Sequence, residues 1–258
     1  KLKESSLIIA PLVASVTISI YGVYQTKLWR YINVKYINKE ELKRQLAYGI
    51  PLVPNQICWW FNGAVGKYIV NYFIGSSANG IIALATRFPN LVSVIMQIYF
   101  LAWTENSIFE INSEDREDYF SKNFNGLILF LIYGSAGLLL VVKIYMLLMV
   151  SDKYKEADLI IPILVIAMIF NALATFLGTV YTASMKTKDA FSTTIYAAIS
   201  NIICFFLFIP TVAICGYALA NVCSYSIFLF TRLRSVRKIM NIYIYKRKKI
   251  YNYIIYIY

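Results

Sequence analysis

The stretch that decides the fold runs from residue 48 to residue 103 and reads YGIPLVPNQICWWFNGAVGKYIVNYFIGSSANGIIALATRFPNLVSVIMQIYFLAW. It contains two long apolar segments joined by GSSANG, and each is long enough to cross a membrane, which takes about 20 residues. Each segment also carries a cation, Lys67 in the first and Arg87 in the second. Charged side chains are costly in hydrocarbon and usually face a bundle interior or a water-filled cavity. The stretch therefore predicts two membrane helices that line a cavity.

The composition extends this interpretation to the whole chain. Of 258 residues 59% are hydrophobic, whereas soluble domains contain about 45–50%. Continuous apolar runs recur along the sequence, which indicates an all-α integral membrane protein. The net charge is +12, but the basic residues cluster between the runs. This pattern is typical of membrane topology and of contact with membrane lipids, so we expect no nucleic-acid partner.

We predict about seven transmembrane helices. Their expected ranges are 5–24, 42–74, 79–103, 123–150, 159–184, 190–210 and 212–231. Residues 1–41 form a first part, with one helix and a basic linker. Residues 42–231 form a six-helix part, and residues 232–258 form a basic tail, of which residues 239–258 are expected to contact anionic lipid.

The basic residues also predict the orientation. Of the 25 Lys and Arg, 18 fall in the loops and the tail on one side of the seven expected helices. The positive-inside rule makes that side cytoplasmic. The loops at residues 110–122 and 184–189 and the tail are then inside, whereas GSSANG and the loop at residues 151–158 are outside.

The chain offers few groups for catalysis or metal binding. It has no histidine, and its four cysteines lie in apolar segments without the spacing of metal ligands. Every Asp and Glu falls in a loop or near the end of an expected helix. We therefore expect no metal, no cofactor and no enzymatic activity, and a cationic interior should bind an anion.

Polar residues fall on one side of the second and third expected helices. On the second helix they include Asn55, Trp59, Asn62 and Lys67. On the third they form a narrow stripe: Thr86, Asn90, Ser93, Gln97 and Thr104. Polar side chains can hydrogen-bond packed membrane helices to one another. A cation on each helix favours a water-filled cavity instead, with amide and tryptophan side chains suited to sugars.

Three cations are expected at a similar depth. Lys67, Arg87 and Lys143 each lie seven or eight residues from the outer end of an expected helix, which is about 10–12 Å along the axis. We expect them to bind a diphosphate. The alternative is that their long side chains reach the membrane surface, as lysine and arginine often do.

The same residues resemble a known family. The segment IPLVPNQICWWFNGAVGKYIVNYFIG, followed by SANGIIALATRFPNLVSVIMQIYFLAWTENSI, is similar to lipid-linked oligosaccharide flippases for O-antigen and capsule. These are polysaccharide transporters of the multidrug/oligosaccharidyl-lipid/polysaccharide exporter superfamily. The matching elements are Pro-Leu-X-Pro-Asn, the Lys67–Ile69 triplet, Asn79-Gly80, Arg87–Pro89 and Ala102-Trp103 before Glu105. Where the family often has an acid before the first cation, this chain has Gly66.

The resemblance implies an all-α membrane protein with two six-helix lobes in the bacterial cytoplasmic membrane. This chain would supply the last helix of an N-terminal lobe that is otherwise missing, and the whole C-terminal lobe. The implied function is to move undecaprenyl-diphosphate-linked oligosaccharide to the outer leaflet by alternating access through a cationic cavity. The implied partners are the missing lobe, a polysaccharide polymerase and chain-length machinery. Lys67, Arg87 and Lys143 would bind the diphosphate, and Asn55, Trp59, Asn62, Asn90 and Gln97 would bind the glycan.

Three alternatives stay open. A cation-coupled multidrug exporter of the same superfamily would need a carboxylate within the membrane. A polymerase or polyprenyl-dependent glycosyltransferase would need a larger outer loop with catalytic residues. An inactive truncated remnant would explain the missing lobe.

Overall fold

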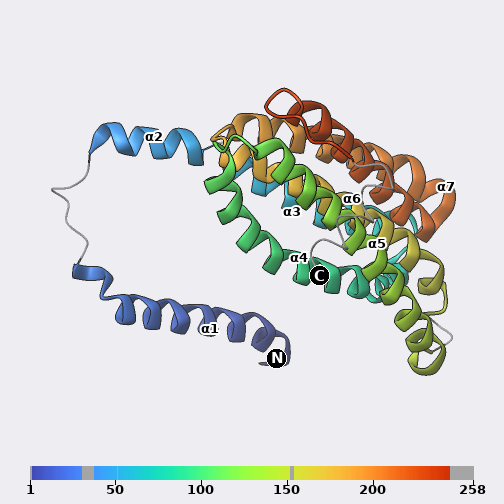
Figure 1. Ribbon diagram of the computed structural model, residues 1–258. Coiled ribbons are helices and arrows are strands. Elements are labelled where there is room, and N and C mark those ends of the chain that lie inside the picture. Colours follow the sequence, from blue (N-terminus) through green and yellow to red (C-terminus); the bar gives the residue numbers. More distant parts are fainter. Residues whose placement is uncertain (1, 31–37, 51, 152–153, 245–258) are drawn as a thin grey trace. The chain divides into compact units, whose positions relative to one another are not determined.

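The computed structural model describes residues 2–30, 38–50, 52–151 and 154–244, except for the side chains of residues 2–8, 28, 52, 54–56 and 59–62. The described chain is helical and contains no strand. It divides into two compact units, residues 1–47 and 48–258, which are described separately below. Figure 1 shows the helices along the chain.

The first unit contains α1 (Leu2–Thr26), the short 3-10 helix η1 (Leu28–Arg30) and most of α2 (Lys39–Gly49). Residues 9–26 of α1 are apolar enough to cross a membrane. The hydroxyl groups of Ser15, Thr17 and Ser19 each donate to the carbonyl oxygen four residues earlier, at 2.8 Å. These bonds satisfy polar groups that hydrocarbon would otherwise leave unpaired, and α1 agrees with the first predicted membrane helix.

The second predicted membrane helix, residues 42–74, is not continuous in the structure. It is divided between α2 and α3 (Leu52–Phe73), and α2 is polar with no buried residue. The sequence places Gly49 at the end of α2 and a proline at position 51 after it, and both residue types disfavour a helix interior. Only α3 in this range is long enough to cross a membrane, since its 22 residues span about 33 Å.

The second unit continues with α4 (Ser76–Glu110), α5 (Arg116–Met149), α6 (Glu156–Ala183) and α7 (Thr187–Val236). With α1, these make five helices in the described chain that are long and apolar enough to cross a membrane. Seven were predicted, and the count differs at two places. The polar helix α3 does not reach the required apolarity, and α7 is counted as one helix. The helices support a multi-pass helical membrane protein.

The helix α7 folds back on itself near its middle. Val212 and Ala213 have non-helical backbone angles, with φ of 51° at Ala213. The Ser224 hydroxyl donates to the Ala197 carbonyl oxygen at 3.1 Å, and the rings of Phe205 and Tyr217 stack with centroids 5.4 Å apart. Both contacts pair residues on either side of the turn, so α7 is an antiparallel pair of helices. These helices correspond to the predicted ranges 190–210 and 212–231.

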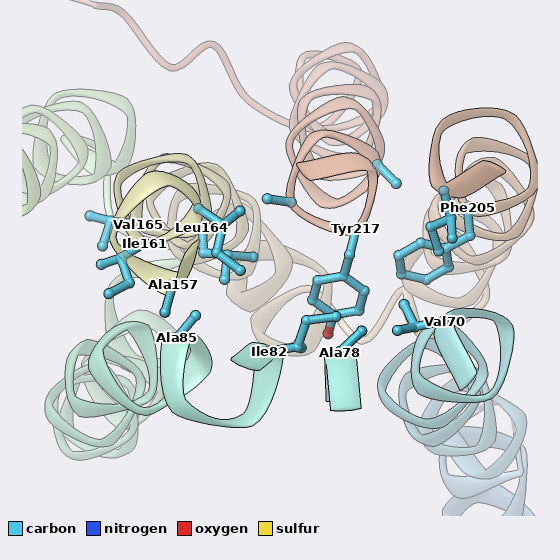
Figure 2. Close-up of a cluster of buried hydrophobic side chains, with 14 of the residues drawn as sticks. Val70, Ala78, Ile82, Ala85, Ala157, Ile161, Leu164, Val165, Phe205 and Tyr217 are labelled. Atoms are coloured by element: carbon cyan, nitrogen blue, oxygen red, sulfur yellow. The ribbon is translucent and has the colours of Figure 1, made fainter. Parts of the chain in front are cut away.

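The core of the second unit lies around α6, α7 and the start of α4. Figure 2 shows Tyr217 of α7 between Val70 of α3 and Ile82 of α4. Val70 and Ile82 have no exposed surface, and Ala85 of α4 is equally buried. The core holds α3 against α7 and α4 against α6, and this arrangement sets the direction of the polar residues on α3 and α4.

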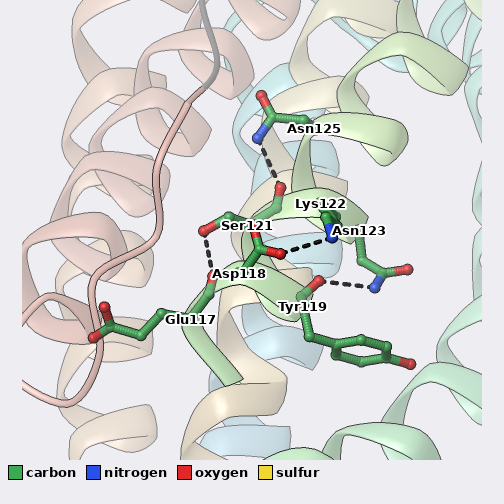
Figure 3. A network of polar contacts seen from close by, with 7 residues as sticks. All are labelled: Glu117, Asp118, Tyr119, Ser121, Lys122, Asn123 and Asn125. Atoms are coloured by element: carbon green, nitrogen blue, oxygen red, sulfur yellow. Dashed lines mark hydrogen bonds and ion pairs between the residues drawn. The ribbon is translucent and has the colours of Figure 1, made fainter. Parts of the chain in front are cut away.

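The segment after α7 is bound to the first turns of α5. The Asn241 backbone N–H donates to Glu117 Oε1 at 2.9 Å, and the Tyr243 N–H donates to Ser121 Oγ at 3.0 Å. Asn125 Nδ2 donates to the Tyr243 carbonyl oxygen at 2.8 Å. Figure 3 shows Glu117, Ser121 and Asn125 along α5. We call residues 239–244 the C-terminal strap. This part of the predicted basic tail therefore contacts α5.

The ends of the helices form two groups. At one end, the strap joins the end of α7 to the start of α5. At the other end, Tyr154 lies beside Gly80, near the start of α4. The Tyr154 ring is 3.7 Å from the position that a Cβ on Gly80 would occupy. The loops around residues 75 and 150 therefore lie at one end, and those around residues 113 and 240 at the other. This grouping agrees with the predicted topology.

Candidate functional site

The α3–α4 connection fixes how the two predicted cavity helices lie against each other. Gly75 separates them with φ of 113°, a backbone conformation that favours glycine. Just beyond the turn, Asn79 Nδ2 donates to the Lys67 carbonyl oxygen at 3.2 Å. Lys67 and Asn79 are therefore level with each other along the two helices.

This hydrogen bond also gives the direction of the polar stripe on α4. Asn79 lies seven residues before Thr86, so it belongs to the same stripe on the helix surface. Because Asn79 points toward α3, the start of the stripe is on the side of α4 that faces α3. The side chain of Lys67 is exposed on α3 next to this side, so Lys67 and the stripe border one surface.

Farther along, the stripe is only partly exposed. Asn90 and Gln97 are exposed, as binding residues would have to be. Thr86 and Ser93 are half-buried: Thr86 bonds to the Ile82 carbonyl oxygen at 2.9 Å, and Ser93 contacts Met168 Sδ of α6 at 3.2 Å. The stripe therefore combines an exposed polar surface with contacts within and between helices.

Arg87 lies at a different depth from Lys67, contrary to the expectation. It is eight residues beyond Asn79, which is about 12 Å along the helix, and Asn79 is level with Lys67. The expected common depth depended on starting the helix at residue 79, but α4 starts at Ser76. Arg87 is exposed and lies midway between the buried residues Ala85 and Pro89, so it points away from the core.

The structure separates Lys143 from the other two predicted cations. Tyr145, two residues later on α5, packs against Phe88 of α4 with ring centroids 5.5 Å apart. Residues two apart point to nearly opposite sides of a helix, so Lys143 points away from α4. Its ammonium group instead pairs with the Asp158 carboxylate of α6 at 2.5 Å. Lys143 therefore does not belong to a site formed by α3 and α4.

The remaining predicted site residues are on α3. The side chains of Asn55, Trp59 and Asn62 lie outside the described part of the structure. Gly66 is buried, and a Cβ there would stand 2.6 Å from the Phe205 ring and 2.9 Å from the Tyr217 ring. An acid at this position would displace the α7 rings, so the packing of α3 against α7 requires a residue without a side chain here.

Neither Lys67 nor Arg87 is paired with a carboxylate in the described part of the chain. The helix α3 contains no Asp or Glu, and the first acid on α4 is Glu105, near its end. The exposed surface of α3 and α4 thus has two cations and several amides, and no acid at their depth. Such a surface can bind a multiply charged anion through charge-assisted hydrogen bonds.

Sequence reasoning missed one buried cation, Arg232. It was placed in the basic tail, but α7 continues to Val236 and Arg232 is 5% exposed. Its Nη1 donates to the Ala174 carbonyl oxygen of α6 at 2.6 Å, and its guanidinium lies 4.2 Å from the Phe228 ring centroid. Buried residues recur every four positions toward it, at Ala220, Ser224 and Phe228, and this row of small and apolar residues could have indicated burial.

The chain was also compared with protein-family models, with curated proteins and with solved structures, and none of them matches.

Proposed function

We propose that this chain is part of a transporter that moves undecaprenyl-diphosphate-linked oligosaccharide across the bacterial cytoplasmic membrane. The observation that carries the proposal is the exposed surface of α3 and α4, with Lys67 and Arg87 and no acid at their depth. The resemblance of this same stretch to O-antigen and capsule flippases supports the choice of substrate.

The polar groups of this protein surface cannot face hydrocarbon at low cost. The surface therefore suits a lipid with a charged headgroup. Exposed Asn90, Gln97, Lys67 and Arg87 require water, protein or a polar ligand around them. A facing lobe would enclose this surface as a water-filled cavity. The lipid chain would stay in the membrane, while the diphosphate and sugars move through the cavity during alternating access.

The two cations would act in sequence along the transport path. They are separated by about 12 Å along the helix axes, so a diphosphate that moves along the cavity would meet them one after the other. In this proposal Lys67 binds the diphosphate near the end of the cavity that Gly75 marks, and Arg87 binds it farther inside. Amide side chains such as Asn90 and Gln97 exchange hydrogen bonds with sugar hydroxyls.

Alanine variants in the full-length protein test the proposal. A hydrogen bond to a charged group contributes about 1.5–3 kcal/mol, so Lys67→Ala and Arg87→Ala should each weaken binding by roughly 10- to 100-fold and lower surface polysaccharide. Arg87→Lys should retain part of the export because it keeps the charge. Surface polysaccharide is measured by immunoblot, with protein amounts matched in membranes.

Lys188→Ala is the matched control. Lys188 is exposed at the start of α7, far in sequence from the α3–α4 surface, and its replacement should leave export unchanged. Wild-type amounts of polysaccharide in both the Lys67 and the Arg87 variants would contradict the proposal. Normal export with altered drug resistance would favour the multidrug exporter.

A further inference from the structure

A groove lies between α5 and α6, away from the surface just described. It has a volume of about 430 Å³. Its apolar lining consists of Leu139, Leu140, Val142, Leu159, Ile161 and Pro162. Leu140 and Leu159 are more than two-thirds exposed, at 71% and 68%, so the groove opens to the surroundings of the helices.

An ion pair lies at the edge of this groove. Lys143 and Asp158 both line it, with their side chains 60% and 34% exposed. The ammonium group has three donors, and the carboxylate has two acceptor oxygens. The pair uses one of these donors and Asp158 Oδ2. Each partner can therefore still bind a group of opposite charge outside the pair.

The position of the pair matches the boundary between hydrocarbon and headgroups. Lys143 lies six residues before the last residue of α5, and Asp158 is the third residue of α6. These positions are roughly 9 Å and 3 Å from the helix ends, in a membrane whose hydrocarbon core is about 30 Å thick. The ion pair thus lies where a phospholipid has its headgroup, and the apolar groove lies where a phospholipid has its acyl chains.

We propose that the α5–α6 groove binds one phospholipid whose headgroup contains both a phosphate and a primary ammonium group. Lys143 donates to the phosphate, and the Asp158 carboxylate accepts from the ammonium group. One acyl chain lies along Leu139, Leu159 and Pro162. The choice follows from charge complementarity, since an anionic lipid would meet the carboxylate and a lipid without a free N–H donor would leave it unmatched.

The binding of single lipids to the delipidated full chain tests this assignment. Phosphatidylethanolamine, phosphatidylcholine and phosphatidylglycerol with identical acyl chains are added one at a time, and bound copies are counted by native mass spectrometry. We expect one retained phosphatidylethanolamine, bound at least fivefold more tightly than the other two lipids. The Lys143→Gln, Asp158→Asn double variant should lose tenfold or more of this affinity and the preference among lipids.

Two further variants test whether lipid binding depends on this groove and on this ion pair. Lys122→Gln removes another α5 lysine that pairs with a carboxylate, Asp118 at 2.7 Å, but does not line the groove, and it should bind phosphatidylethanolamine as the wild type does. Leu159→Trp fills the groove from its rim without changing a charge, and should weaken binding of all three lipids. Equal binding of the three lipids, a preference for phosphatidylglycerol, or wild-type binding by the double variant would overturn the proposal.

Discussion

At the scale of single residues, a glycine allows a buried arginine to hold two helices together. Gly178 of α6 lies under the Arg232 guanidinium, and a Cβ at position 178 would stand 2.3 Å from Nη1 and 2.9 Å from Cζ. The absence of a side chain lets Arg232 reach the Ala174 carbonyl oxygen. A buried cation has to keep such a partner, because an unpaired charge in this environment is costly.

We predict that Gly178→Ala destabilises the protein even though alanine favours helices. The added methyl group would displace the guanidinium from Ala174, at a cost of about 1–3 kcal/mol for overpacking. The midpoint of thermal unfolding in detergent, followed by circular dichroism, should fall. Gly126→Ala is the control: Gly126 is helical and exposed, with no atom within 4 Å of an added Cβ. That variant should be more stable by about 0.5–1 kcal/mol, and an equal rise for Gly178→Ala would contradict the proposed contact.

The individual site residues were only partly predictable. The pattern of polar residues identified the exposed positions of Lys67, Arg87, Asn90 and Gln97. It did not place Lys143, because the side of a helix that a residue faces depends on its neighbours. Phe88 contacts Tyr145, and this contact turns Lys143 toward Asp158. The spacing of apolar residues along α5 does not reveal this contact.

At the scale of elements, the strap is held by residues on one side of α5. Glu117, Ser121 and Asn125 are four residues apart and so lie in a row, and each bonds to Asn241 or Tyr243. Met240 and Ile242, at alternate positions, are buried with exposed fractions of 2% and 7%. The strap is therefore attached by both polar and apolar contacts.

We predict that Asn125→Ala loosens the strap. The change removes the bond from Asn125 Nδ2 to the Tyr243 carbonyl oxygen, and a loss of about 1 kcal/mol should speed local opening roughly fivefold. Hydrogen exchange followed by mass spectrometry measures this in a peptide containing residues 239–244. Asn123→Ala is the control, because Asn123 Nδ2 donates to the Tyr119 carbonyl oxygen of its own helix. Equal exchange rates in the two variants would show that the Asn125 bond does not hold the strap.

The existence of most helices was predictable, whereas their contacts were not. Apolar runs give α1, α6 and both halves of α7 within about five residues of the expected bounds, whereas α4 ends seven residues later and α5 begins seven residues earlier than expected. The predicted helix at residues 42–74 was too long because it included part of the polar helix α2, which ends at Gly49. The strap was predicted only as a basic tail, since its partners on α5 lie 118 to 124 residues earlier in the chain.

At the scale of the whole molecule, the sides of the membrane remain a prediction. The excess of Lys and Arg places the strap end in the cytoplasm, and the structure brings the loops together at two ends. We predict that, with the four native cysteines replaced, an impermeant thiol reagent added outside labels Ser76→Cys and Ser151→Cys but not Asn112→Cys. All three positions are exposed, so differences in labelling report the side of the membrane. If position 112 alone were labelled, the predicted orientation would be wrong and the strap end would lie outside.

The strap also has a consequence for the order in which the protein is made. Its seat on α5 emerges from the ribosome about 120 residues before the strap itself does. At a synthesis rate of about 5–20 residues per second, that interval lasts roughly 6 to 24 s. During this time Glu117, Ser121 and Asn125 lack the hydrogen-bond partners that the strap later provides. The strap can bind these partners only after translation has passed residue 243, when α4 to α7 have all been synthesised.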